Sequence, residues 1–191
     1  MFKIITIPNK KLRKFSEPVK KVDKKIINFI DELGETLIGG TSIPGVGLSA
    51  IQVGKPTRIF VTYLPKDKSL PSDKWNEKTL ELKVFINPKI VAKSKKMTLG
   101  GRKDKPFLEG CLTIPNIWGP VLRHDWVRGE YTSLDDKNSP KKMVDKFSGF
   151  QARVVQHEHD HLEGILFTDH SIRDNLPVYE ERGEELVEIK L

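Results

Sequence analysis

Apolar residues recur every three and four positions in an early segment of the chain. The residues that form this stripe are Val22, Ile26, Phe29, Ile30, Leu33 and Leu37. Such spacing places side chains on one face of a helix, so the pattern predicts a helix over residues 22–38. Gly39 and Gly40 follow and can supply the left-handed backbone that ends a helix.

Short runs of β-branched and aromatic residues predict strands in the middle of the chain. They cover residues 58–63, 83–86 and 126–134. The third run is followed by four good turn residues at 135–138 and then by residues 142–144, a pattern typical of a hairpin. Residues 65–77 are polar and contain prolines, so we expect a surface loop there.

A second helix is expected from about residue 148 to residue 162. Ser148 can cap its start, and Gly164 can terminate it. Positions spaced by four, three and four share one face of this helix, and they hold Phe150, Val154, His157 and His161. Two histidines on the buried face of a helix require an explanation.

These elements predict an α+β fold. We expect short antiparallel β-sheets packed around a central helix that carries the histidines, with another helix near the N-terminus. The length of 191 residues suits one catalytic domain, expected over residues 1–170, with a C-terminal tail over residues 171–191. The tail is acidic and ends in an apolar–polar alternation at residues 187–191, which predicts a closing strand packed on the same domain.

The composition narrows the classes of protein to which this chain can belong. Its hydrophobic fraction of 37% and charged fraction of 31% fit a globular protein. We find no apolar run near the roughly 18 residues that a membrane span needs, and the first residues do not resemble a signal peptide. We therefore expect a cytoplasmic protein without a membrane partner. The single cysteine, Cys111, excludes an internal disulfide.

The net charge of +7 is concentrated near the N-terminus. The basic residues there are Lys10, Lys11, Arg13, Lys14, Lys20, Lys21, Lys24 and Lys25. They form either a solvated surface beside a helix or a patch that attracts a polyanion such as ribosomal RNA through counterion release. Because no aromatic residues alternate with them, base stacking and sequence-specific nucleic-acid binding are not expected.

The segment from His157 to His161 has the pattern H-E-x-x-H. Imidazoles at i and i+4 on a helix can bind one metal ion, and Glu158 can then take a proton from a water molecule at that ion. The alternative is a pair of ordinary surface histidines. His159 points away from the pair, and Asp160 can orient a ligand or pair with a basic side chain. His124 and His170 are interpreted as structural.

A catalytic metal site of this type needs a third protein ligand. The pattern H-E-x-x-H-x-x-G-x-x-H would end at Phe167, which cannot bind a metal. A glutamate about 20 residues downstream is a second option, but Glu180, Glu181 and Glu184 lie in a tail that is not helical in pattern. The remaining candidate is Cys111, in a short apolar stretch flanked by Gly110 and Pro115.

Three motifs in order resemble those of the peptide deformylase family, which carries G-x-G-L-A-A-x-Q, E-G-C-L-S and H-E-x-D-H-L-x-G. This chain has GVGLSAIQ at residues 45–52, EGCLT at residues 109–113 and HEHDHLEG at residues 157–164. The opening segment with Pro8, Leu12-Arg13 and Pro18 is also similar, so the resemblance extends to about residue 168. It implies a metal-dependent hydrolase that removes the formyl group from the N-terminal formyl-methionine of new polypeptides and releases formate.

The resemblance also implies roles for individual residues. Cys111, His157 and His161 would bind one divalent metal, Fe(II) in the cell, with Zn, Ni or Co possible in purified protein. Glu158 would be the catalytic base and then the acid, and the oxyanion donors would be the Gln52 side chain and the Leu112 backbone N–H. The residues expected to bind the substrate are Gly45, Val46, Gly47, Glu109, Gly110, Phe150 and Val154.

The substrate would lie extended along the Val46-Gly47 segment and add a strand to an open sheet edge. Gly45 and Gly47 allow a close approach of the backbone. Val46, Phe150 and Val154 would line a pocket for the methionine side chain, although each suits a plain core equally well. Nascent formyl-methionyl peptides are the expected partner, with a transient ribosome contact as a further possibility.

The chain departs from the family pattern at three positions and in its tail. Ser49 replaces the usual Ala, Thr113 replaces Ser, and Trp118 lies where many bacterial members have a basic residue in the substrate cleft. The tail resembles relatives that end in a strand rather than in a long helix. The rival functions are a zinc endopeptidase with another third ligand, an inactive relative that only binds, and a nucleic-acid binder.

Overall fold

The computed structural model describes residues 1–39, 45–67, 70, 72–102 and 104–190. Its α-helices are α1 (Lys24–Gly39), α2 (Gly149–Leu162) and α3 (Phe167–Arg173). Short 3-10 helices form η1 (Lys10–Arg13), η2 (Ala50–Val53) and η3 (Ser72–Lys74). The described part of the chain contains no helix with the length and apolar character that crossing a bilayer requires.

Two antiparallel sheets hold most of the strands. The five-stranded sheet has the order β1 (Gly47–Ser49), β2 (Ile59–Pro65), β3 (Leu80–Lys93), β10 (Trp126–Leu134) and β11 (Pro140–Ser148). The four-stranded sheet has the order β13 (Glu185–Ile189), β12 (Val178–Arg182), β8 (Ile114–Pro120) and β7 (Leu108–Cys111). Two small pairs join β4 (Met97–Thr98) to β9 (Arg123–His124), and β5 (Gly101–Arg102) to β6 (Lys105–Pro106).

Strand β2 of the five-stranded sheet is buried on both faces. Successive side chains of a strand point to opposite faces, and in β2 the neighbours Phe60 and Val61 belong to different hydrophobic clusters. Val61 packs with Leu33 and Leu37 of α1, whereas Phe60 packs in the cluster that includes α2. Fully burying such a side chain stabilises the fold by about 1.5–3 kcal/mol, so both helices are held firmly against the sheet.

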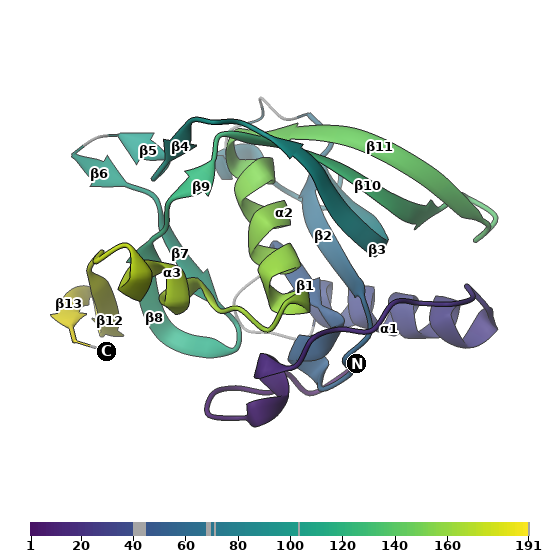
Figure 1. The fold of residues 1–191 in the computed structure, drawn as a ribbon, viewed down its shortest axis with the longest axis horizontal. Coiled ribbons are helices and arrows are strands. Elements are labelled where there is room, and N and C mark those ends of the chain that lie inside the picture. Colours follow the sequence, from purple (N-terminus) through teal and green to yellow (C-terminus); the bar gives the residue numbers. More distant parts are fainter. Residues whose placement is uncertain (40–44, 68–69, 71, 103, 191) are drawn as a thin grey trace.

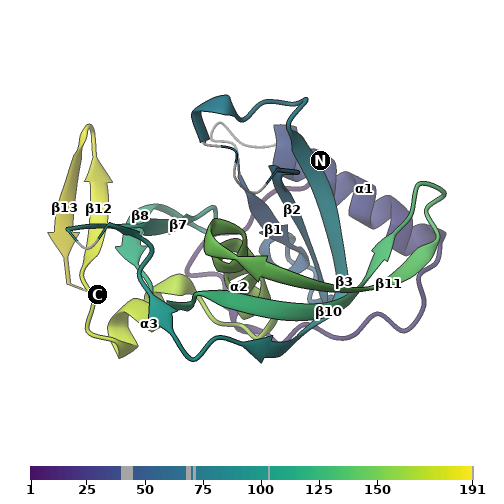
Figure 2. The ribbon, with the colours of Figure 1, turned by 90° about the horizontal axis from the view of Figure 1, so that it is seen from above.

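Helix α2 lies between the five-stranded sheet and the strands β7 and β8 (Figure 1). Its residues Ala152, Val155 and Leu162 are buried in the cluster formed with the larger sheet. The strands β12 and β13 extend the β7–β8 sheet away from the helix, as the view from above shows (Figure 2). Helix α2 therefore joins two sheets, and the functional side chains lie on its face toward β7.

The predicted α+β class and most of the predicted elements are confirmed. The early helix forms as α1, although Gly40 lies outside the described residues, and the predicted hairpin forms as β10 and β11. β3 has 14 residues, far more than the four that we expected. The apolar pattern missed most of this strand because charged residues and Pro88 interrupt it. One end of β3 pairs with β2 and the other with β10, and the change of partner occurs around Asn87, whose φ is 52°.

Some local expectations about α2 and the C-terminal region were wrong or incomplete. Ser148 occupies the N-cap position of α2, but its side chain accepts no capping hydrogen bond among the described residues. Gly149 at the start of the helix has φ 56°, so the first turn departs from regular capping geometry. The sequence pattern did not predict α3, which crosses residue 170. The C-terminal strand forms as β13, and its partner β12 pairs with β8.

Candidate metal centre

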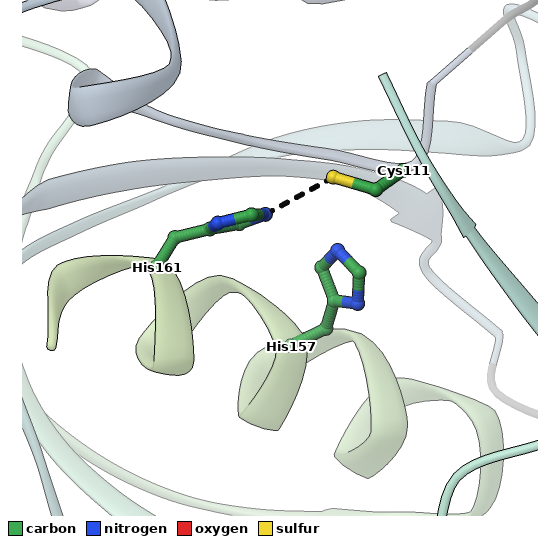
Figure 3. A group of neighbouring side chains, drawn as sticks. All are labelled: Cys111, His157 and His161. Atoms are coloured by element: carbon green, nitrogen blue, oxygen red, sulfur yellow. Dashed lines mark hydrogen bonds between the residues drawn. The ribbon is translucent and has the colours of Figure 1, made fainter. Parts of the chain in front are cut away.

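Cys111 at the end of β7 meets His157 and His161 of α2. One potential ligand atom from each residue lies within 4.8 Å of the others, and this is the metal-competent group found in the described part of the chain. The Cys111 Sγ and His161 Nε2 atoms are 3.2 Å apart, and the two imidazole rings face each other edge-on with centroids 4.9 Å apart (Figure 3). Small side-chain rotations would bring the three atoms onto one ion.

The chemistry of these donors fits a divalent metal. Burial by itself raises the pKa of the Cys111 thiol, but the neighbouring His161 and His157 rings outweigh burial and hold the pKa well below its usual value. The thiolate is the form that binds metals. The Thr113 hydroxyl lies 3.0 Å from Sγ and can donate to it. A thiolate with two imidazoles suits zinc, iron, cobalt or nickel.

Glu109 holds His157 in its orientation. The Glu109 Oε2 atom lies 3.0 Å from His157 Nδ1, so the other ring nitrogen points toward Cys111 (Figure 3). Arg123 donates two hydrogen bonds of 3.0 and 2.9 Å to the same carboxylate, and Arg153 donates one of 2.7 Å. Burial opposes the ionised form of Glu109, but Arg123 and His157 lower its pKa far below the usual range. The carboxylate is therefore an anionic anchor for one metal ligand.

Glu158 is a buried carboxyl group next to the three donors. It is 3% exposed, and its Oε2 accepts a hydrogen bond of 2.7 Å from the Ser49 hydroxyl. Burial raises its pKa, and the nearby His157 and His161 counter only part of that effect. Gly47 packs directly on it, since a Cβ there would come within 2.7 Å of the carboxyl carbon. A base with a raised pKa suits proton transfer near neutral pH.

Gln52 of η2 also reaches this centre. The Ser49 backbone N–H donates to its Oε1 at 2.7 Å, so the amide nitrogen must point the other way. Its Nε2 lies 3.6 Å from Cys111 Sγ. The side chain is 1% exposed and therefore held in this orientation. It places a preorganised N–H donor beside the metal ligands.

A cleft of about 690 Å³ opens onto this centre. It brings together the predicted substrate-binding residues, and those in its lining are Gly45, Val46, Gly47, Glu109, Gly110, Phe150 and Val154. Leu112, which follows Cys111 in the turn before β8, lines it as well. β1 is the edge strand of the larger sheet, so an extended chain can lie beside residues 45–47.

His159 and Asp160 of the histidine motif bind partners other than the metal donors. His159 lies 3.1 Å from Arg58 and is not part of the metal group, as predicted. Asp160 pairs with Arg123 and with His170 Nε2 at 2.7 Å, so it takes the predicted role of partner to a basic side chain. His124 is structural, since its Nδ1 lies 2.7 Å from the Ser94 carbonyl. Neither Phe167 nor a tail glutamate joins the metal group.

Sequence reasoning missed the arginines that hold Glu109. Arg123 and Arg153 are 3% and 5% exposed, and both donate to that carboxylate. One signal was available for Arg153, because it lies four positions before His157 and shares its helix face. No sequence pattern indicated Arg123, because its partner Glu109 lies 14 residues away on another strand.

The sequence of this chain is similar to a family model and to known proteins. The family model described as polypeptide deformylase matches residues 1–176. A peptide deformylase of Bradyrhizobium sp. (strain BTAi1) is 38% identical over 167 residues, which cover 87% of this chain and 85% of that protein.

Solved structures of peptide deformylases are also similar to this chain. A peptide deformylase from Ehrlichia chaffeensis is 32% identical with a TM-score of 0.71, over 89% of this chain and 87% of the other. A class I type b peptide deformylase from Acinetobacter baumannii, solved with Met-Ala-Ser bound, is 27% identical with a TM-score of 0.73, over 89% of this chain and 98% of the other. With sequence, fold and metal donors in agreement, the chain belongs to the polypeptide deformylase family.

Proposed function

We propose that this protein removes the formyl group from the N-terminal formyl-methionine of newly made polypeptides and releases formate. The observation that carries the proposal is the convergence of Cys111, His157 and His161 beside the buried carboxyl group of Glu158. A linear amide that enters the cleft meets metal donors, a proton acceptor and an N–H donor together. Family membership supports the same activity.

Cys111, His157 and His161 would hold the divalent ion. When bound, such an ion supplies Lewis-acid polarisation of a carbonyl group and makes a nearby water molecule more acidic. Glu158 takes a proton from the attacking water as the new C–O bond forms at the formyl carbon. The C–N bond then breaks, and Glu158 passes the proton to the leaving amine, so that formate and a free N-terminus result.

Gln52 is the proposed side-chain donor to the oxyanion. Its amide nitrogen faces the centre because its oxygen is held by Ser49, so the donor needs no reorganisation during the reaction. The Leu112 backbone N–H is the second proposed donor, placed next to Cys111 in the chain. Loss of one such donor typically raises a barrier by about 3 kcal/mol.

The cleft supports binding of an extended peptide that begins with methionine. Gly45, Val46 and Gly47 form the edge along which the peptide backbone would lie, with Glu109 and Gly110 on the facing strand. Phe150 and Val154 are the proposed contacts of the methionine side chain. The Acinetobacter relative binds Met-Ala-Ser, a peptide of the same chemical class as the proposed product.

We propose Fe(II) as the metal in the cell and zinc, nickel or cobalt as alternatives in purified protein, since all four suit this donor set. The decisive test is formate release from a formyl-methionyl peptide by protein purified without oxygen, with its metal content assayed. Cys111→Ala should lose most of the metal. A zinc endopeptidase with another third ligand would keep its metal in that variant.

We further propose a cytoplasmic location and a transient ribosome contact through the basic residues between positions 10 and 25. The substrate is made on the ribosome, and the positive charge suits a polyanion. Sedimentation with ribosomes at increasing salt tests this contact, which should weaken steeply. We also retain a catalytic domain at residues 1–170 with a tail at residues 171–191, although α3 continues across that boundary.

A further inference from the structure

The C-terminal hairpin contributes a carboxylate to the mouth of the catalytic cleft. Glu181 of β12 lines the cleft, together with Trp118 of β8. The Trp118 indole N–H donates to Glu181 Oε2 at 2.8 Å. β12 is tied to β8 through the pairs Tyr179–Trp118 and Glu180–Ile117, so the position of Glu181 follows from the sheet itself.

The indole of Trp118 contacts both Glu181 and the residue before the metal donor Cys111. Trp118 pairs with Gly110 across β7 and β8, and a Cβ on Gly110 would lie 2.6 Å from the indole ring. The ring therefore rests on the residue that precedes the metal ligand Cys111. A peptide held beside that strand, with its formyl group at the metal donors, would pass Trp118 and Glu181 on its way out of the cleft.

Glu181 differs from the other acidic groups of the cleft. Glu109 is neutralised by Arg123 and Arg153, and Glu158 is buried against Ser49. Glu181 is exposed to solvent, and among the described residues it has a neutral indole as its hydrogen-bond partner and no cation. It therefore presents a negative charge, held in place by Trp118, to a peptide in the cleft.

Lys3 is the other exposed charged residue of the cleft lining, and it has no ion-pair partner in the described part of the chain. It belongs to the N-terminal segment, near α1, whereas β12 lies at the opposite end of the molecule (Figures 1 and 2). The two charges thus come from elements that lie far apart in the fold. The side formed by β8 and β12 is negative, even though the whole chain carries a net charge of +7.

We propose that Glu181, held by Trp118, makes this enzyme prefer formyl-methionyl peptides with a lysine or arginine at one of the first two positions after the methionine. This inference rests on the proposed deformylase function. A partly exposed ion pair contributes modestly, so the expected preference for a cationic over an anionic residue is about three-fold in kcat/KM. The net charge alone would favour anionic peptides, so the expected preference opposes the global field.

The test compares formyl-Met-Ala-Lys with formyl-Met-Ala-Glu, and formyl-Met-Lys-Ala with formyl-Met-Glu-Ala, by formate release from the metal-loaded protein. The lysine peptide of at least one pair should react faster, and added salt should reduce the ratio. Glu181→Gln keeps a hydrogen-bond acceptor for the indole and removes the charge, so it should abolish the preference. Trp118→Phe keeps a ring over Gly110 and removes the N–H, so it should weaken the preference.

Glu184→Gln is the matched control, because Glu184 is an exposed acid of the same hairpin that does not line the cleft. It should keep both the rate and the ratio of the unmodified protein. Equal rates for both peptides of each pair would overturn the role of Glu181 while leaving deformylation intact, as would a preference that survives Glu181→Gln. Absence of formate release from every peptide would instead contradict the proposed function.

Discussion

The Ser49 hydroxyl donates a hydrogen bond of 2.7 Å to the Oε2 atom of Glu158, 109 residues further along the chain. Ser49 also lies 3.0 Å from the Glu158 backbone carbonyl, so one side chain of β1 contacts both ends of the glutamate. The proposed base therefore does not depend on helix α2 alone for its position. Ser49, at which this chain departs from the expected alanine, thus contacts the carboxyl group of the proposed base.

We expect Ser49→Ala to reduce kcat/KM while leaving the metal bound. The carboxyl group would lose its hydroxyl donor, and a lost hydrogen bond to a charged group costs about 1.5–3 kcal/mol. Formate release and metal content, measured on the same preparation, check this. Glu158→Gln should retain metal and lose nearly all activity. A Ser49→Ala enzyme with an unaltered rate would mean that the hydroxyl does not help to position the base.

Gly47→Ala should abolish most of the activity, because the new Cβ would overlap with the Glu158 carboxyl group. Both groups are buried, so the carboxylate must move away from the metal donors. Overpacking of this kind typically costs about 1–3 kcal/mol of stability. Gly39→Ala is the control, since a Cβ there would have its nearest neighbour at 4.0 Å. Equal rates for the two variants would contradict the predicted clash.

Glu109→Gln should weaken both the metal site and the fold. Arg123 and Arg153 would lose the carboxylate that neutralises them, and breaking a buried ion pair costs about 3–5 kcal/mol. Because the carboxylate also orients His157, metal affinity should fall by about 10- to 100-fold. Urea unfolding of the metal-free protein and competition with a chelator separate the two effects. Unchanged metal affinity would show that His157 needs no such anchor.

The ion pair between Arg13 and Asp169 should make stability depend on pH in the acidic range. Burial opposes ionisation of Asp169, but the Arg13 guanidinium outweighs it and lowers the pKa of the carboxyl group. A lowered folded-state pKa contributes stability above the unfolded value of about 3.9, and that stability is lost as the pH falls through the folded value. Since the pair is partly exposed, the contribution should stay below about 1 kcal/mol.

Asp169→Asn should therefore be less stable than the unmodified protein near neutral pH, and the difference should shrink below about pH 4. Thermal unfolding at a series of pH values measures this. Asp104→Asn serves as the control, because Asp104 pairs with Arg102 on the exposed surface and its loss should not register. A stability difference between Asp169→Asn and the parent that is constant with pH would rule out the ion pair as its cause.

Local periodicity was sufficient to predict those features that lie within a single helix. The helix over Lys24–Gly39 and the pairing of His157 with His161 both follow from the geometry of one helix, in which positions three and four apart share a face. The strand over Leu80–Lys93 was mostly missed, because its pairing changes from one neighbour to the other at Asn87 and its exposed residues interrupt the apolar pattern.

The sequence by itself determined the helix that carries His157 and His161 and indicated Glu158 as the proposed base, and its motifs indicated Cys111 as the third ligand. Only the tertiary structure decided that Glu109 is neutralised by Arg123 and Arg153, and that Glu181 reaches the cleft. The physical reason is that backbone periodicity determines which face of an element is buried. The partner of a buried charge is chosen only when elements distant in sequence pack together, because the cost of burial then requires a specific opposite charge.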